Sequence, residues 1–89
     1  MAKWSVALDP SADKQLGKLS KANRDRVLRY LFDRVASLSD PRQLGSPLKG
    51  GFSDYWRYRV GDIRIICSLE DDKLVVLVIS IGHRREIYR

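Results

Sequence analysis

Apolar and charged side chains alternate along residues 55–67, on both sides of the pair Gly61-Asp62. Alternation of this kind is typical of strands with one buried face, and a Gly-Asp pair is suited to a two-residue turn. The pattern therefore predicts a β-hairpin in which Arg59 lies directly opposite Arg64. The side chains expected on its buried face are those of Trp56, Tyr58, Val60, Ile63, Ile65 and Cys67.

Three arginines, Arg57, Arg59 and Arg64, share the opposite face of the predicted hairpin. Like charges that face each other across two strands destabilise a sheet, so an anion between them would relieve the repulsion. The planar guanidinium group binds phosphate through two parallel hydrogen bonds, which makes phosphate the natural candidate. The same pattern fits a solvated basic face at a sheet edge, and the hairpin alone leaves both interpretations open.

Two helices are predicted between a short first strand and the hairpin. Apolar and polar residues alternate over residues 3–8, which indicates a strand. Asp9 is suited to cap a helix that starts at Pro10, and Ser20 to cap a second helix that starts at Lys21. Both helices carry an apolar stripe at helical spacing. The stripe of the first consists of Ala12, Leu16 and Leu19, and that of the second of Val27, Leu28, Leu31, Phe32, Val35 and Leu38.

The second predicted helix also carries several arginines outside its apolar stripe. The preferred interpretation is a solvated helix face whose arginines form a few ion pairs with Asp25 and Asp33. The alternative is that these arginines steer a polyanion toward the domain. The residues concerned are Arg24, Arg26, Arg29 and Arg34.

Residues 39–53 contain several prolines and glycines and are predicted to form a loop. A loop of this length in a small domain is often functional. Lys49 lies in it next to two glycines, just before the hairpin arginines, so its amine could approach a phosphate.

After a turn predicted at Asp71-Asp72, residues 74–81 are apolar at almost every position. A strand of this composition is apolar on both of its faces. Because two helices cover only one face of the sheet, we expect an exposed apolar strip beside the arginines, and such strips usually mark a partner site. In this register Leu74, Val76 and Val78 face the core, whereas Val75, Leu77 and Ile79 join Ile66 on the arginine face.

Together these elements predict one α+β domain over residues 1–89. The expected order is a strand, two helices and three further strands. The helix pair is expected to pack on one face of a mainly antiparallel four-stranded sheet. A short basic tail completes the chain.

The charge of the chain predicts a polyanionic partner. Seventeen lysines and arginines outnumber eleven aspartates and glutamates, and the net charge of +6 favours a nucleic acid, an acidic protein or both. Cys67 is the only cysteine and falls on the buried face, so we expect no disulfide and an inert thiol. The single histidine lacks metal-ligand neighbours, so we expect no metal or cofactor. No signal peptide or membrane-length apolar run occurs, so we expect a cytoplasmic protein without membrane contact.

The order of these elements and their motifs resembles the RelE branch of the RelE/ParE toxin superfamily of bacterial type II toxin–antitoxin systems. Each motif alone is weak, but their order along nearly the whole chain is specific. The motifs that carry the resemblance are Leu48-Lys49-Gly50, Tyr55-Trp56-Arg57-Tyr58-Arg59, Asp62-Ile63-Arg64, the apolar last strand, and Gly82-His83-Arg84-Arg85-Glu86-Ile87-Tyr88.

The resemblance implies a ribosome-dependent endoribonuclease that cuts messenger RNA in the ribosomal A site through attack of the 2′-hydroxyl on the adjacent phosphodiester. It implies that Tyr88 is the base, that Arg84 supports the transition state and leaving group, and that Arg64 holds the scissile phosphate. It further implies a RelB-like antitoxin, and operator DNA as a partner only through the toxin–antitoxin complex. The positions implied to bind RNA phosphates are Arg57, Arg59 and Lys49.

Several alternatives remain open at the level of the sequence. His83 could act as the base in place of Tyr88. The same superfamily includes ParE-like toxins, which inhibit DNA gyrase without cutting nucleic acid. A third interpretation is an RNA- or DNA-binding module without lethal activity. The antitoxin is expected to anchor on Val75, Leu77 and Ile79.

Overall fold

A computed structural model describes residues 4–48 and 55–83 of the protein. The predicted hairpin forms the centre of the fold. Strand β3 (Tyr55–Val60) pairs in antiparallel fashion with β4 (Ile63–Glu70). The register is the predicted one, with Arg59 opposite Arg64. Gly61 has a φ of 59°, a conformation that glycine adopts without strain at such a turn.

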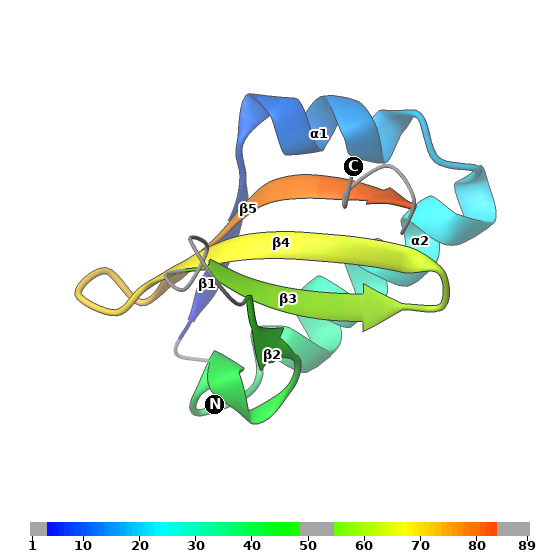
Figure 1. Ribbon diagram of the computed structural model, residues 1–89. Coiled ribbons are helices and arrows are strands. Elements are labelled where there is room, and N and C mark those ends of the chain that lie inside the picture. The colour runs from blue at the N-terminus through cyan, green and yellow to red at the C-terminus, as the bar shows by residue number, and fades with distance from the viewer. Residues whose placement is uncertain (1–3, 49–54, 84–89) are drawn as a thin grey trace.

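The sheet has five strands, in the order β1-β5-β4-β3-β2 (Figure 1). Strand β1 (Ser5–Leu8) runs parallel to β5 (Val75–His83), and the other pairs are antiparallel. The expectation of four strands was wrong, because Ser46–Pro47 forms a short strand β2 against β3. The α+β class and the mainly antiparallel sheet are confirmed.

Strand β2 belongs to a segment that the sequence predicted as a loop. A 3₁₀-helix, η2 (Pro41–Gln43), comes before it and begins where the Asp40 carboxylate accepts a hydrogen bond from the Arg42 backbone N–H. The Arg42 guanidinium donates two hydrogen bonds of 2.9 Å to the Asp71 carboxylate in the β4–β5 turn. These hydrogen bonds hold the Asp71 pKa below its usual value. The segment that contains η2 and β2 is therefore connected by hydrogen bonds to the β4–β5 turn, which lies far from it in sequence.

The helices begin at the caps that the sequence predicts. The Asp9 side chain caps α1 (Pro10–Gly17), and the Ser20 hydroxyl caps α2 (Lys21–Arg29) by accepting a hydrogen bond of 3.2 Å from a backbone N–H. A π-helical segment, η1 (Tyr30–Val35), continues α2. Within the described part of the chain, no helix is long and apolar enough to cross a membrane.

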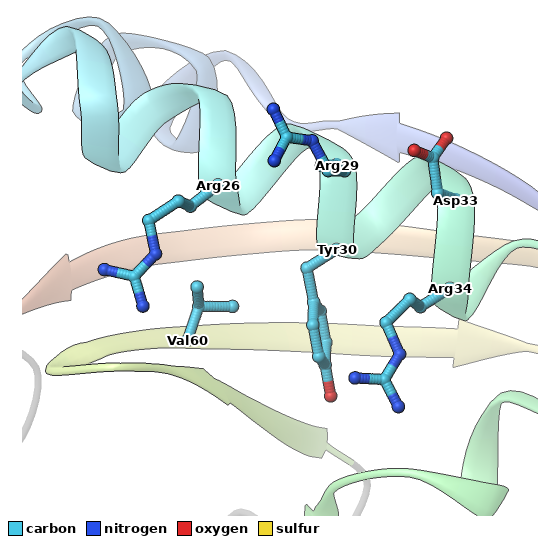
Figure 2. A pocket seen from close by; sticks show the side chains of 6 residues that line it. All are labelled: Arg26, Arg29, Tyr30, Asp33, Arg34 and Val60. Atoms are coloured by element: carbon cyan, nitrogen blue, oxygen red, sulfur yellow. The ribbon is translucent and has the colours of Figure 1, made fainter.

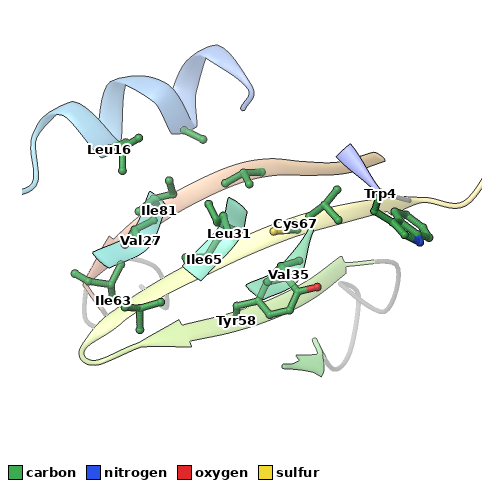
Figure 3. Close-up of a cluster of buried hydrophobic side chains, with 14 residues drawn as sticks. Trp4, Leu16, Val27, Leu31, Val35, Tyr58, Ile63, Ile65, Cys67 and Ile81 are labelled. Atoms are coloured by element: carbon green, nitrogen blue, oxygen red, sulfur yellow. The ribbon is translucent and has the colours of Figure 1, made fainter. Parts of the chain in front are cut away.

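The core lies between the helices and one face of the sheet (Figure 3). Every second residue of the hairpin enters it, as predicted, although Trp56 is only half-buried. Phe32 of the predicted stripe is 47% exposed, because Val27, Leu31 and Val35, spaced four residues apart, already fill the helix–sheet contact. The buried cluster consists of Trp4, Ala12, Leu16, Val27, Leu31, Val35, Tyr58, Val60, Ile63, Ile65, Cys67, Val76, Val78 and Ile81.

Strand β5 departs from the predicted register at two places. The turn before it has four residues rather than two, and Leu74 in that turn has a φ of 54° and is 42% exposed instead of facing the core. A bulge then lies opposite the Ile66–Cys67 step, where Ile66 pairs with Ser80 and Cys67 with Val78. Val76 and Val78 face the core as predicted, and the extra residue in the bulge brings Ile81 into the core as well.

The Cys67 side chain is completely buried in this core. Burial raises the pKa of its thiol well above the usual value, because a thiolate would lose its solvation there. Cys67 is therefore a structural core residue rather than a nucleophile, as the sequence indicates.

Candidate functional site

The three hairpin arginines lie on the sheet face that points away from the core, in three different environments. Arg59 is exposed and lies directly opposite Arg64. Arg57 is half-buried and donates a hydrogen bond of 3.0 Å from Nη2 to the Ser46 hydroxyl of β2. Strand β2, which the sequence did not predict, therefore orients one of the predicted phosphate-binding residues.

Arg64 is the least accessible of the three arginines. It is only 6% exposed, and its Nε is buried without a hydrogen-bond partner in the part of the chain that the structure describes. Arginine is rarely buried to this extent without a partner, because an unsatisfied charged donor costs more free energy than a neutral one. A buried guanidinium with a free donor is prepared to bind an anion.

The end of β5 lies beside Arg64. Gly82 pairs with Arg64, and His83, the last residue of the strand, is exposed and pairs with Ile63. Strand β5 therefore ends next to the buried guanidinium. Lys49, Arg84 and Tyr88, which the sequence analysis also placed in the site, lie outside the described residues.

The predicted apolar strip on β5 is only partly accessible. Val75, Leu77 and Ile79 are each half-buried, whereas Ile66, expected beside them on an open face, is 6% exposed. The expectation of a fully exposed strip was therefore wrong at Ile66. Val75 and Leu77 alternate with the buried Val76 and so keep the predicted alternation.

Two aromatic residues of β3, Trp56 and Tyr58, stabilise the scaffold and do not belong to the arginine face. Trp56 Nε1 donates a hydrogen bond of 2.7 Å to the Leu44 carbonyl, and the Tyr58 hydroxyl donates one of 2.7 Å to the Pro41 carbonyl. Burial raises the Tyr58 pKa far above its usual value, so this phenol acts as a donor and not as a base. Trp56 and Tyr58 are thus not available to stack on an RNA base from the arginine face.

A second basic site, which the sequence did not reveal, lies on the helix side of the sheet (Figure 2). It is a pocket of about 310 Å³ between α2–η1 and the end of β3. Arg26, Arg29 and Arg34 are exposed, as the preferred sequence interpretation expects. The expected ion pairs with Asp25 and Asp33 do not form, because the ion pairs among the described residues join other groups. The residues that line the pocket are Arg26, Arg29, Tyr30, Asp33, Arg34 and Val60.

Comparison with known proteins agrees with the fold and with the sequence motifs. Residues 6–88 match the family described as the ParE toxin of type II toxin–antitoxin system, parDE. Toxin RelG of Mycobacterium tuberculosis is 24% identical over 97% of both chains. Toxin RelE of the same organism is 27% identical over 97% of this chain and 87% of its own length.

A solved structure shows the same fold. The toxin–antitoxin complex RelBE2 from Mycobacterium tuberculosis contains a chain that superposes with a TM-score of 0.85 at 23% identity, over 94% of each chain. The resemblance to RelE-type toxins found in the sequence is therefore confirmed along almost the full length. The chain belongs to the family of ParE toxins of type II toxin–antitoxin systems, and its relatives within that family include toxins of the RelE type.

Proposed function

We propose that this toxin is a ribosome-dependent endoribonuclease that cuts messenger RNA in the A site and so inhibits translation. One structural observation supports the proposal above the others. Arg64 is buried with an Nε that has no partner among the described residues, faces Arg59 across the hairpin, and lies beside the end of β5. A scissile phosphate at this point would accept the free hydrogen bond and relieve the repulsion between the two arginines.

The chemistry requires fixed positive charge more than it requires a strong acid–base pair. In the proposed reaction the 2′-oxygen attacks the adjacent phosphorus, the bond to the 5′-oxygen breaks, and a cyclic phosphate remains. Negative charge grows on the phosphate oxygens in the transition state, and preorganised guanidinium groups stabilise it. Arg64 holds the scissile phosphate in this scheme, while Arg57, Arg59 and Lys49 hold flanking phosphates.

The remaining roles fall on the C-terminal segment. Tyr88 accepts the proton of the 2′-hydroxyl, and Arg84 stabilises the charge on the leaving 5′-oxygen, which takes its proton from solvent. An ordinary tyrosine has a pKa of about 10 and is a weak base at neutral pH. In this proposal, arginines that approach the Tyr88 hydroxyl would favour its phenolate and so support the role of base. His83 is the alternative base.

We expect the free protein to cut ribosome-bound messenger RNA much faster than the same RNA in solution. Trp56 and Tyr58 are committed to the scaffold, so neither provides the base stacking that would position an unstructured strand. Single-turnover cleavage of one labelled messenger RNA, with and without ribosomes, measures the difference. A matched messenger RNA with a single 2′-deoxynucleotide at the cut site should stay intact on ribosomes, because it lacks the nucleophile.

Two results would count against this function. Rapid cutting of the free RNA at the same protein concentration would remove the requirement for the ribosome. Growth arrest that leaves messenger RNA intact, together with inhibition of supercoiling by purified gyrase, would favour the ParE-like alternative. The family match is compatible with that alternative.

We also propose that a RelB-like antitoxin covers the arginine face, with apolar anchors on Val75, Leu77 and Ile79 and carboxylates near the hairpin arginines. These three side chains are half-buried and flank a basic surface, which fits an amphipathic acidic segment. A complex has been solved for a relative with the same fold, RelBE2. Occupation of this face would block the arginines and neutralise the toxin.

Leu77→Glu should weaken the toxin–antitoxin complex by at least tenfold, because it places a carboxylate in the apolar part of the contact. Phe32→Glu is the matched control, since Phe32 is 47% exposed and belongs to η1 on the helix side of the sheet. Titration calorimetry of the co-expressed, separated partners measures both affinities. Equal affinities for the two variants would place the antitoxin elsewhere.

A further inference from the structure

The pocket on the helix side of the sheet has the geometry of an anion site. Arg26, Tyr30 and Arg34 are spaced four residues apart and therefore share one face of the helix. Figure 2 shows the guanidinium groups of Arg26 and Arg34 on either side of the Tyr30 ring, all three directed toward the sheet. The Asp33 carboxylate, the one acidic group in the lining, is turned the other way.

The groups in this pocket are held in place by their neighbours. The Arg34 guanidinium carbon lies 5.6 Å from the centre of the Tyr30 ring, a cation–π contact. The Tyr30 ring packs edge-on against the buried Tyr58 at 5.9 Å. Arg26 lies against the hairpin turn so closely that a Cβ on Gly61 would be 3.2 Å from its Nη2. Tyr30 and the Arg34 guanidinium are thus positioned by these contacts, which lowers the entropic cost of binding a ligand, although Arg26 and Arg34 are exposed.

The donors of the pocket are not used by carboxylates. Among the residues that the structure describes, the ion pairs within 4 Å join Arg42 to Asp40 and Asp71, and Lys73 to Glu70, and none involves a helix arginine. Burial raises the Tyr30 pKa even though Arg34 opposes that shift, so the Tyr30 hydroxyl remains a hydrogen-bond donor. Two guanidinium groups and a phenol therefore present donors along one face of the helix.

We propose that this pocket binds the phosphate backbone of a structured RNA, as a second contact separate from the hairpin arginines. Arg26 and Arg34 are eight positions apart, or roughly 12 Å along a helix, which favours a run of phosphates over a single small anion. Val60 lines the pocket, and the exposed Arg59 before it points to the opposite sheet face. One polyanion that passes over the hairpin turn can therefore reach both basic surfaces. The inference rests on the proposed RNA-directed function.

The test is the salt dependence of RNA binding, which counts phosphate contacts. Fluorescence anisotropy with a labelled RNA hairpin, titrated at several sodium chloride concentrations, gives the slope of log K against log salt. Each lost phosphate contact reduces that slope by about 0.7–0.9, so R26Q/R34Q should reduce it by about 1–2. The control K18Q/K21Q removes the same charge from exposed positions outside the pocket and should keep the wild-type slope. Thermal unfolding of each variant verifies that it is folded.

Three outcomes would contradict the proposal that this pocket binds RNA phosphates. The two double variants could reduce the slope equally, which would mean that net charge alone acts. R26Q/R34Q could bind RNA like the wild type but lose binding to a polyglutamate peptide, which would make the pocket a site for an acidic protein. The wild type could fail to bind the RNA hairpin at all.

The nuclease activity is measured separately, so the two proposals can fail independently. Suppose that the protein leaves ribosome-bound messenger RNA intact and that R26Q/R34Q still reduces the salt slope of RNA binding. This result refutes the proposed nuclease function and supports the RNA contact of the pocket. Suppose instead that the protein cuts messenger RNA on ribosomes and that R26Q/R34Q retains the wild-type salt slope. This result refutes the proposed RNA contact of the pocket and leaves the proposed nuclease function intact.

Discussion

Tyr88→Phe is expected to slow single-turnover cleavage of ribosome-bound messenger RNA by about 10²–10⁴-fold, the usual loss when one acid–base group is removed. The substitution keeps the ring and removes the hydroxyl that is proposed to take the 2′-proton. His83→Ala is the matched control, because His83 is the exposed last residue of β5 and the other candidate base. We expect His83→Ala to cost far less. Rapid quench of ribosome complexes with labelled messenger RNA gives both rates.

The two variants decide between the two bases. Thermal unfolding of each protein controls for loss of structure, and binding to ribosomes controls for loss of substrate. A Tyr88→Phe protein that cuts at nearly the wild-type rate, together with an inactive His83→Ala protein, would assign the proton transfer to His83. If both variants are slow, both side chains contribute to cleavage.

Gly45→Ala should destabilise the fold by about 2–5 kcal/mol, combining the cost of a left-handed backbone for alanine with that of an overpacked contact. Gly45 has a φ of 74°, and a Cβ there would overlap the Arg57 carbonyl oxygen. The same Cβ would lie 2.8 Å from both Trp56 Nε1 and Tyr58 Cδ1. The Arg57 carbonyl is part of the paired backbone of β3, so it cannot move without disturbing the sheet. Urea unfolding monitored by tryptophan fluorescence measures the loss.

Gly17→Ala is the internal control for this measurement. Gly17 is the last residue of α1, and a Cβ there meets no atom within 4 Å. Alanine at this position should stabilise the protein by about 0.5–1 kcal/mol through helix propensity. A Gly45→Ala protein that unfolds at the wild-type urea concentration would show that the segment before β2 does not pack against β3 as described.

The hairpin was predictable because its information is local. Alternation sets the two faces, and the pair Gly61-Asp62 sets the register, so the facing arginines follow from a few adjacent residues. Strand β2 was not predictable in this way. Two residues, one of them proline, carry no strand signal, and their pairing depends on the close approach that Gly45 permits to a strand about ten residues later.

The errors on β5 and on the helix have a different origin. A strand that is apolar on both faces contains no signal for its phase, so neither the four-residue turn with Leu74 nor the bulge could be located. The helix arginines were visible in the sequence. Whether they pair with nearby aspartates or line a pocket depends on side-chain directions, which sequence spacing does not determine.

The parallel pairing of β1 with β5 bears on when this toxin first exists during its own synthesis. Ser5 pairs with Val75, and the last strand also completes one side of β4. Contacts between such distant parts of a chain cannot form until both have been made, and they slow folding. A nascent chain therefore carries its hairpin arginines before it has a finished sheet to hold them. The complete sheet forms only after residues 75–83 have been synthesised, so the arginine face gains its final shape later than the residues that compose it.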